Sequence, residues 1–163
     1  MPRILKICLF LFCFCAFTAV ISPWLLYQYG LSNITQLPKR VDYPSLTADE
    51  KAALLKDFRV KTFIMPVALN PWTYFFEMQP RGFDKLRSDE ERSKSILAFV
   101  TLRYNGDGHL KYSRGLSWHF SGAALAIWLA NQGTEDQILS QAHYYLLKNT
   151  NYRTCGNSRQ CPK

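Results

Sequence analysis

The hydrophobic positions of this chain form one long apolar run, followed by shorter segments with helical periodicity. The run from Ile7 to Tyr27 contains no charged residue and follows Arg3 and Lys6. It is long enough to cross the hydrocarbon core of a bilayer as a helix. Trp24 and Tyr29 stand near its end, where aromatic residues are typical of a membrane interface. The pattern therefore predicts a transmembrane segment over residues 1–29.

A cleaved signal peptide is the alternative, because such signals also place basic residues before an apolar core. The small residues that a signal peptidase requires lie inside the run, in Ala16-Phe17-Thr18 and Thr18-Ala19-Val20, and not at its end. We therefore expect an uncleaved signal-anchor. Its basic flank predicts a cytoplasmic N-terminus and an extracytoplasmic location from Gly30 onward. A bacterial inner membrane and a eukaryotic secretory-pathway membrane both fit this pattern, and we expect the bacterial inner membrane.

Beyond the run, residues 30–44 have no regular period and contain two prolines, so we predict a linker there. Three later segments have the form of a capping box, in which a hydroxyl and a side chain three residues later satisfy each other's backbone donors. They are Thr47-Ala48-Asp49-Glu50, Ser88-Asp89-Glu90-Glu91 and Thr134-Glu135-Asp136-Gln137. Asn70-Pro71 favours another helix start, since asparagine caps a helix and proline suits its first position.

Two further patterns concern the interior of the domain. Residues 115–130 are apolar nearly all round, which predicts a buried central helix. Arg59–Val67 alternates loosely, which fits either a short strand or an irregular buried loop. We therefore predict an all-α protein, with an N-terminal single transmembrane helix followed by one small helical domain of four or five helices over residues 45–150.

The cysteines near the C-terminus agree with an oxidising compartment. Cys155 and Cys161 can close a small loop, so we predict a disulfide that pins down a tail over residues 151–163. A zinc site would need four ligands, and His119 and His143 stand at separations that match no familiar zinc motif. We expect no metal site and no cofactor.

Without Arg3 and Lys6, the net charge of +8 falls to +6 for the part of the chain beyond the anchor. This excess suggests a partner of opposite sign, such as anionic lipid or an anionic wall polymer. Basic residues are interspersed with acidic ones, so an ordinary solvated surface explains the charge equally well. We do not expect nucleic acid as a partner, because the domain is predicted to be extracytoplasmic and carries no aromatic-basic recognition motif.

Candidate chemistry is sparse. Glu77 stands among aromatic residues that could desolvate its carboxyl group and raise its pKa, which makes it a candidate general acid, although exposure on a polar helix face is the simpler interpretation. His119 lies in the most apolar helix and is expected to be a core histidine. An aromatic contact surface is predicted at Trp72, Tyr74, Phe75 and Phe76.

Residues 95–139 contain several short motifs in a fixed order: Ser95-Ile96, Leu102, Ala124-Leu125-Ala126-Ile127-Trp128-Leu129 and Thr134-Glu135-Asp136-Gln137-Ile138-Leu139. In these motifs the segment resembles the later helices of peptidoglycan glycosyltransferase domains, a lysozyme-like family. The resemblance implies a helical fold and a place in the cell envelope. The Glu-Asp-x-x-Phe signature that carries the family's catalytic glutamate has no counterpart here, so neither Glu77 nor another acid can be carried over as that residue.

Three hypotheses follow. The first is a membrane-anchored envelope protein whose helical domain is a non-enzymatic binding or assembly module for a membrane complex, lipid headgroups or wall polymer. The second is a glycosyltransferase-like or lysozyme-like enzyme that acts on glycan strands, with Glu77 as its acid. The third is a purely structural membrane anchor.

Overall fold

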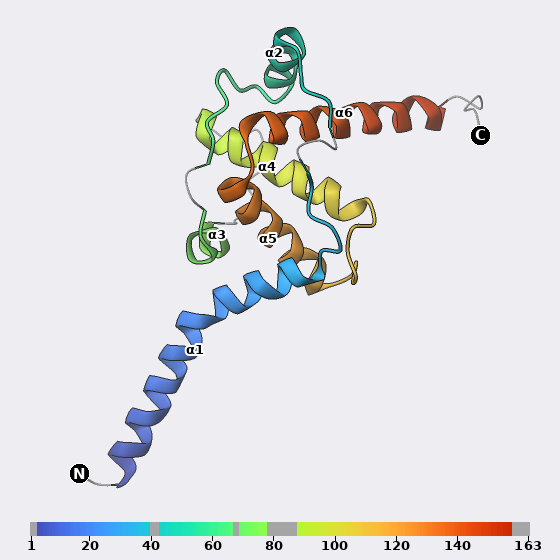
Figure 1. Ribbon diagram of the computed structural model, residues 1–163. Helices are drawn as coiled ribbons and strands as arrows, with labels where there is room; N and C mark the ends of the chain where they lie inside the picture. Colours follow the sequence, from blue (N-terminus) through green and yellow to red (C-terminus); the bar gives the residue numbers. More distant parts are fainter. Residues whose placement is uncertain (1–2, 40–42, 67–68, 78–87, 158–163) are drawn as a thin grey trace.

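The protein is an all-helical chain in the computed structural model, which describes the backbone of residues 3–39, 43–66, 69–77 and 88–157. Side chains are described in the same ranges except at residues 3–4, 75–77 and 149–157. The described residues form six helices and no strand (Figure 1). The helices are α1 (Arg3–Asn33), α2 (Ala48–Asp57), α3 (Pro71–Glu77), α4 (Asp89–Gly106), α5 (Leu116–Gln132) and α6 (Glu135–Asn157). The predicted fold class is confirmed at this level.

Helix α1 is the one described helix that is long and apolar enough to cross a membrane. Its N-terminal part projects away from the remaining helices (Figure 1). Side chains from Leu5 to Val20 are all exposed, and the most apolar window of the helix buries none of its residues inside the protein. A stretch of this length with no protein cover is compatible with a transmembrane helix or a signal anchor, because leaving so many large apolar side chains in water is unfavourable.

The C-terminal turns of α1 belong to the folded domain. The boundary between anchor and linker expected after residue 29 falls inside α1, which continues to Asn33 and packs against α5. Gly30 is buried at this contact, and a β-carbon in its place would lie 2.7 Å from the Ala124 β-carbon and against the Phe120 carbonyl oxygen. Only glycine lets the two helices approach this closely.

Asn33 ends α1 with a set of hydrogen bonds that we call the Asn33 junction. Its amide nitrogen donates to the Tyr112 carbonyl oxygen at 2.9 Å and to Ser121 Oγ at 2.8 Å, while its amide oxygen accepts from the Tyr112 N–H at 2.9 Å. The following residue, Ile34, forms an isolated antiparallel bridge with Leu110. The segment that leaves α1 is thus held along the loop that precedes α5.

Helix α5 is the centre of the domain and packs against α1, α3 and α4, while α6 packs against α4 and α2. Residues 121–127 of α5 are all buried. The predicted buried central helix is therefore confirmed. The core is built by side chains of α2, α4, α5 and α6, together with residues of the connecting segments: Ile34, Leu54, Phe58, Phe63, Ile96, Leu97, Val100, Leu125, Leu129, Ile138 and Leu139.

The helix starts follow the local sequence. Thr47 and Ser88 cap α2 and α4, and each forms both bonds of its predicted capping box. At the start of α6 the Thr134 hydroxyl accepts from the Gln137 N–H at 3.3 Å, whereas the Gln137 side-chain amide donates to the Pro38 carbonyl oxygen at 3.0 Å. A residue predicted to serve a local cap therefore also binds a segment far away in the sequence.

Residues 60–66 form an irregular loop, so the strand interpretation of Arg59–Val67 is wrong for the described residues. The backbone donors of this loop are satisfied by side chains of α4 and not by a strand partner. The Asp89 carboxylate accepts from the N–H groups of Lys61 and Thr62, and Ser93 Oγ accepts from Ile64 N–H at 3.0 Å. Burial of Val60 and Phe63 then holds the loop on the core.

The predicted C-terminal tail lies mostly outside the described part of the structure. The backbone of α6 continues to Asn157 and so includes residue 155. The Cys155 side chain and the whole of Cys161 lie outside the described residues, and their disulfide remains a prediction.

Candidate functional site

Helix α3 carries the residues that sequence analysis singled out. Asn70 caps it, because its side-chain oxygen accepts from the Thr73 N–H at 2.9 Å. The residue before the cap is tied to α5, since the Asn131 side-chain amide donates to the Leu69 carbonyl oxygen at 2.8 Å. Glu77 is the last residue of α3, but its carboxyl group lies outside the described side chains. Its role as an acid therefore stays a hypothesis.

The predicted aromatic contact surface is partly turned inward. Trp72 and Tyr74 are half-buried, and the Tyr74 ring packs against the hydrophobic core. The side chains of Phe75 and Phe76 lie outside the described residues. Because α3 packs against both α1 and α5, the described half of this surface contributes to packing within the chain.

Burial also perturbs the Tyr74 phenol. Desolvation raises its pKa from the usual 10.0 to about 12, because the ionised ring is poorly solvated beside the core. Burial and the neighbouring Tyr43 hydroxyl raise the pKa of Tyr145 as well. Neither group ionises near neutral pH, so these shifts describe stability and offer no general acid or base at physiological pH.

These shifts predict a loss of stability in alkali. A raised pKa means that the folded chain holds the phenol proton more tightly than the unfolded chain does. The contribution of neutral Tyr74 to the free energy of unfolding is therefore complete below about pH 10 and is lost as the pH rises towards about 12. We expect Tyr74→Phe to show a smaller fall in melting temperature than the wild type between about pH 9 and about pH 11. Tyr112→Phe, at an exposed tyrosine, is the control. Equal falls in melting temperature in the wild type and in Tyr74→Phe would contradict a raised pKa of Tyr74.

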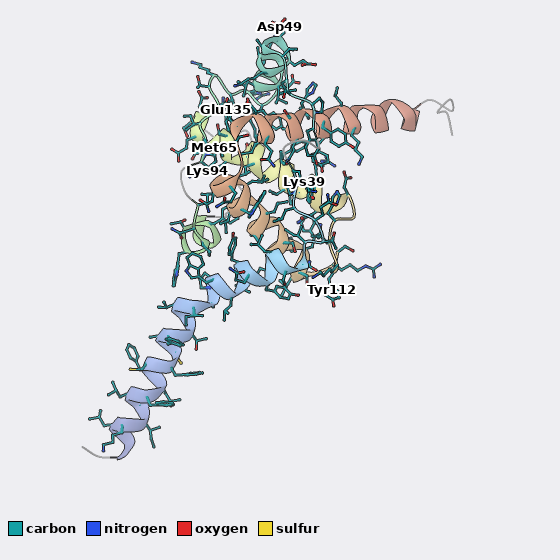
Figure 2. All side chains as sticks on the ribbon, viewed as in Figure 1. Lys39, Asp49, Met65, Lys94, Tyr112 and Glu135 are labelled. Carbon is teal, nitrogen blue, oxygen red and sulfur yellow. The ribbon has the colours of Figure 1, made fainter. Side chains whose placement is uncertain are left out.

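An open groove of about 610 Å³ lies beside the segment that leaves α1. One wall is formed by residues 34–39, and the other by Trp128 of α5 and Gln137 of α6. The lining is mostly apolar and includes Lys39, which is labelled in Figure 2. We call it the strap groove, and residues 34–39 the strap.

Hydrogen bonds from the domain hold the strap in place. The Thr35 N–H donates to the His109 carbonyl oxygen at 2.9 Å, the Tyr104 hydroxyl donates to the Gln36 carbonyl oxygen at 2.5 Å, and Gln137 donates to Pro38. A groove with fixed walls suits binding, because little conformational freedom is lost when it is filled. The Trp128 indole and the other apolar lining residues fit an apolar group of a ligand.

Sequence reasoning missed the strap groove. Two prolines and the lack of a hydrophobic period in residues 30–44 indicated a linker. The strap meets residues of α4, α5 and α6 that are distant in the sequence, so its own residues carry no pattern that predicts these contacts. The Gln137 side chain offered one clue, since a glutamine on the buried side of a helix needs a hydrogen-bond partner. That partner, Pro38, is far away in the sequence.

The histidine prediction is wrong. His119 is exposed, and its ring meets the Trp118 ring edge-on at 5.0 Å between centroids. It occupies the outward face of the first turn of α5, whereas burial begins at Ser121. Among the described residues, no group of three or more His, Cys, Asp or Glu side chains is placed to hold a metal ion.

Comparisons with known proteins do not assign the chain to a family. A scan against protein-family models finds no match, and searches of curated proteins and of solved structures find none.

Proposed function

We propose that this chain is a single-span membrane protein whose helical domain is a non-enzymatic binding or assembly module held against the membrane surface. The observation that carries the proposal is the continuity of α1. Its exposed apolar part and its partly buried last turns are one helix, with Gly30 and Asn33 fastened to α5. A domain fastened in this way cannot rotate freely on a linker, and so presents a constant face to partners in or beside the membrane.

The proposed orientation follows from charge. Arg3 and Lys6 precede the apolar part, which supports a cytoplasmic N-terminus and an extracytoplasmic domain. The membrane that we propose is the bacterial inner membrane. A disulfide between Cys155 and Cys161 would agree with this compartment.

The proposed binding site is the strap groove. It has a size that fits a small ligand or a short segment of a partner. The partner is an envelope protein complex, an anionic lipid or a wall polymer, in keeping with the net charge of +6 beyond the anchor.

Photo-cross-linking from the groove tests this proposal. In cells that express the full chain, p-benzoylphenylalanine replaces Lys39 at the groove or Lys56 on α2, both exposed lysines. We expect a discrete adduct at position 39 that position 56 does not give, and analysis of the adduct tells envelope protein from lipid or wall polymer. Identical adduct patterns at the two positions would contradict the groove as a binding site.

Topology is tested separately with a full-length variant that keeps only Cys155 and Cys161. Labelling of both thiols by an impermeant reagent, in closed cells and only after reduction, supports the extracytoplasmic domain and the disulfide. Labelling only after the inner membrane is opened would invert the orientation and place the partners in the cytoplasm.

The rival proposal is an enzyme that acts on glycan strands. It is based on the resemblance of residues 95–139 and on Glu77 as the candidate acid. Loss of glycan-strand cleavage in Glu77→Gln, with cleavage retained in Glu90→Gln, would replace the binding module by this function. Absence of cleavage by the wild-type chain would remove it.

A further inference from the structure

The part of α1 that follows its exposed N-terminal region has one exposed face. Trp24, Leu25, Gln28, Tyr29 and Ser32 are exposed, at spacings that place them along one side of a helix. The opposite side is turned toward the domain. Leu25 is 62% exposed and Trp24 is 49% exposed, so apolar and aromatic surface is left uncovered directly beside the folded domain.

The start of α5 extends this face. The Tyr29 hydroxyl lies 2.8 Å from Ser117 Oγ, and the Tyr29 ring meets the Phe120 ring edge-on at 6.3 Å. Next to Ser117 in the sequence, Leu116 is 71% exposed. Two distant segments thus bring exposed apolar side chains to one surface.

The loop before α5 completes the surface. The backbone of Tyr112 is held by the Asn33 junction, while its side chain is 66% exposed. Figure 2 shows Tyr112 beside the C-terminal end of α1, on the side of the domain from which α1 departs. We call Trp24, Leu25, Tyr29, Tyr112 and Leu116 the interfacial face.

The course of α1 keeps this face close to the membrane. About 20 residues cross the hydrocarbon core, so a span that begins at Ile7, after Lys6, ends near Leu26, and Trp24 and Leu25 lie at its end. Figure 1 shows that α1 changes direction before it reaches α5. Pro23 inside the helix accounts for the bend, because its missing N–H leaves the Ala19 carbonyl oxygen without its helical donor, and Ser22 Oγ donates to that oxygen at 3.2 Å.

The height of the face is bounded by helix geometry. From Leu25 to Ser32 the helix rises at most about 12 Å along its own axis, and less along the membrane normal once it bends. The headgroup layer is several ångströms thick on each side of the core. The face therefore lies at the level where tryptophan, tyrosine and exposed leucine are favoured.

Charge at the rim agrees with anionic headgroups. Lys111 and Arg114 are exposed on either side of Tyr112, and residues 108–134 contain no acidic residue. Lys111 Nζ donates to the Ser32 carbonyl oxygen at 2.6 Å, which holds its charge against the end of α1. Arg114 presents a guanidinium group that suits a phosphate.

We propose that the interfacial face rests in the headgroup layer of the membrane that α1 spans, and that Arg114 binds the phosphate of an anionic lipid there. This second contact, together with the span, sets the tilt of the domain and the direction in which the strap groove opens. The inference rests on the span of the proposed function, but not on what the groove binds.

Lipid cross-linking from chosen positions tests the contact. The full chain is reconstituted in phosphatidylcholine vesicles that contain phosphatidylglycerol, with p-benzoylphenylalanine in place of one residue. Leu116 probes the interfacial face, Phe12 probes the span, and Leu147 is the matched control, an exposed leucine on α6, which crosses the domain far from α1 in Figure 1. Adducts are identified by mass spectrometry.

We expect lipid adducts at positions 116 and 12, with a yield at 116 several times that at 147. Adducts at position 12 with none at 116 would overturn the interfacial contact and leave the span intact. A lack of adducts at both positions would overturn the span itself. Cross-links from 116 to a second copy or to another protein would assign the face to a protein interface instead.

The composition of the adducts tests Arg114. One basic residue near an anionic surface favours anionic lipid by about fivefold. We expect phosphatidylglycerol to be enriched by about this factor among the adducts at position 116, relative to its share of the vesicle, and Arg114→Gln to remove the enrichment. If the protein that retains Arg114 gives adducts at position 116 with the same lipid composition as the vesicle, the role of Arg114 is overturned.

Discussion

Asn33→Ala is expected to lower the free energy of unfolding by about 2–4 kcal/mol, since each buried polar group left without its partner costs about 1–3 kcal/mol. The side chain is 2% exposed and makes three hydrogen bonds, with the Tyr112 N–H, the Tyr112 carbonyl and Ser121 Oγ. Ser121 keeps a second bond to the Ser117 carbonyl oxygen, which moderates the loss. The measurement is thermal or denaturant unfolding of the full chain in detergent micelles.

Asn131→Ala is the matched control, because Asn131 is exposed and donates one bond, to the Leu69 carbonyl oxygen. We expect it to cost no more than about 1 kcal/mol. A local readout accompanies the global one. The loop that contains Lys111 and Arg114 is held by the Asn33 junction, so trypsin should cleave it faster in Asn33→Ala than in Asn131→Ala. Equal stability and equal cleavage in the two variants would show that the junction does not hold the loop.

Gly30→Leu is the second change with a large expected effect. The added side chain would meet the Ala124 β-carbon and the Phe120 carbonyl group, both fixed by helix α5, so the clash cannot be relieved by moving a flexible side chain. Overpacking of a tight interior contact costs about 1–3 kcal/mol and more when backbone must move, and we expect about 3 kcal/mol here. Unfolding in micelles measures this cost.

Gly106→Leu is the control for Gly30→Leu, because a β-carbon at Gly106 meets no atom within 4 Å. We expect little change or a slight gain in stability there, since leucine favours a helix more than glycine does. If both variants unfold like the wild type, then α1 does not pack on α5 in solution, and the domain is joined to its span by a loose connection. That result would also remove the basis for a fixed domain orientation.

The groove and the interfacial face depend on the same junction. Asn33 and Gly30 hold the last turns of α1 against α5, and the strap continues from there past Tyr104 and Gln137. A variant that loosens the junction should therefore change both the lipid contact at Leu116 and the cross-linking at Lys39. The two surfaces are coupled through the backbone of residues 33–39.

Local features of the sequence were sufficient for most helix starts. Thr47, Ser88, Asn70 and Thr134 form cap hydrogen bonds within three residues, so the partners of each bond stand together in the sequence. The apolar run of α1 is equally local, because its length and lack of charge decide whether it can cross a bilayer. Helix α5 was also recognised as the buried helix from its own sequence, because it is apolar nearly all round.

The tertiary structure decided what the polar residues near the end of that run do. Asn33 could be taken for the start of a linker, but its partners stand 79 and 88 residues away in the sequence. The same holds for Gln137, whose donation to Pro38 joins residues 99 positions apart. Patterns within one helix turn predict local hydrogen bonds and burial, but no local pattern specifies which distant backbone a side chain meets. The sequence by itself therefore determined the apolar helix and the helix starts. Only the tertiary structure decided the interfacial face, through the packing of α1 on α5, and the strap groove, through contacts of the strap with α4, α5 and α6.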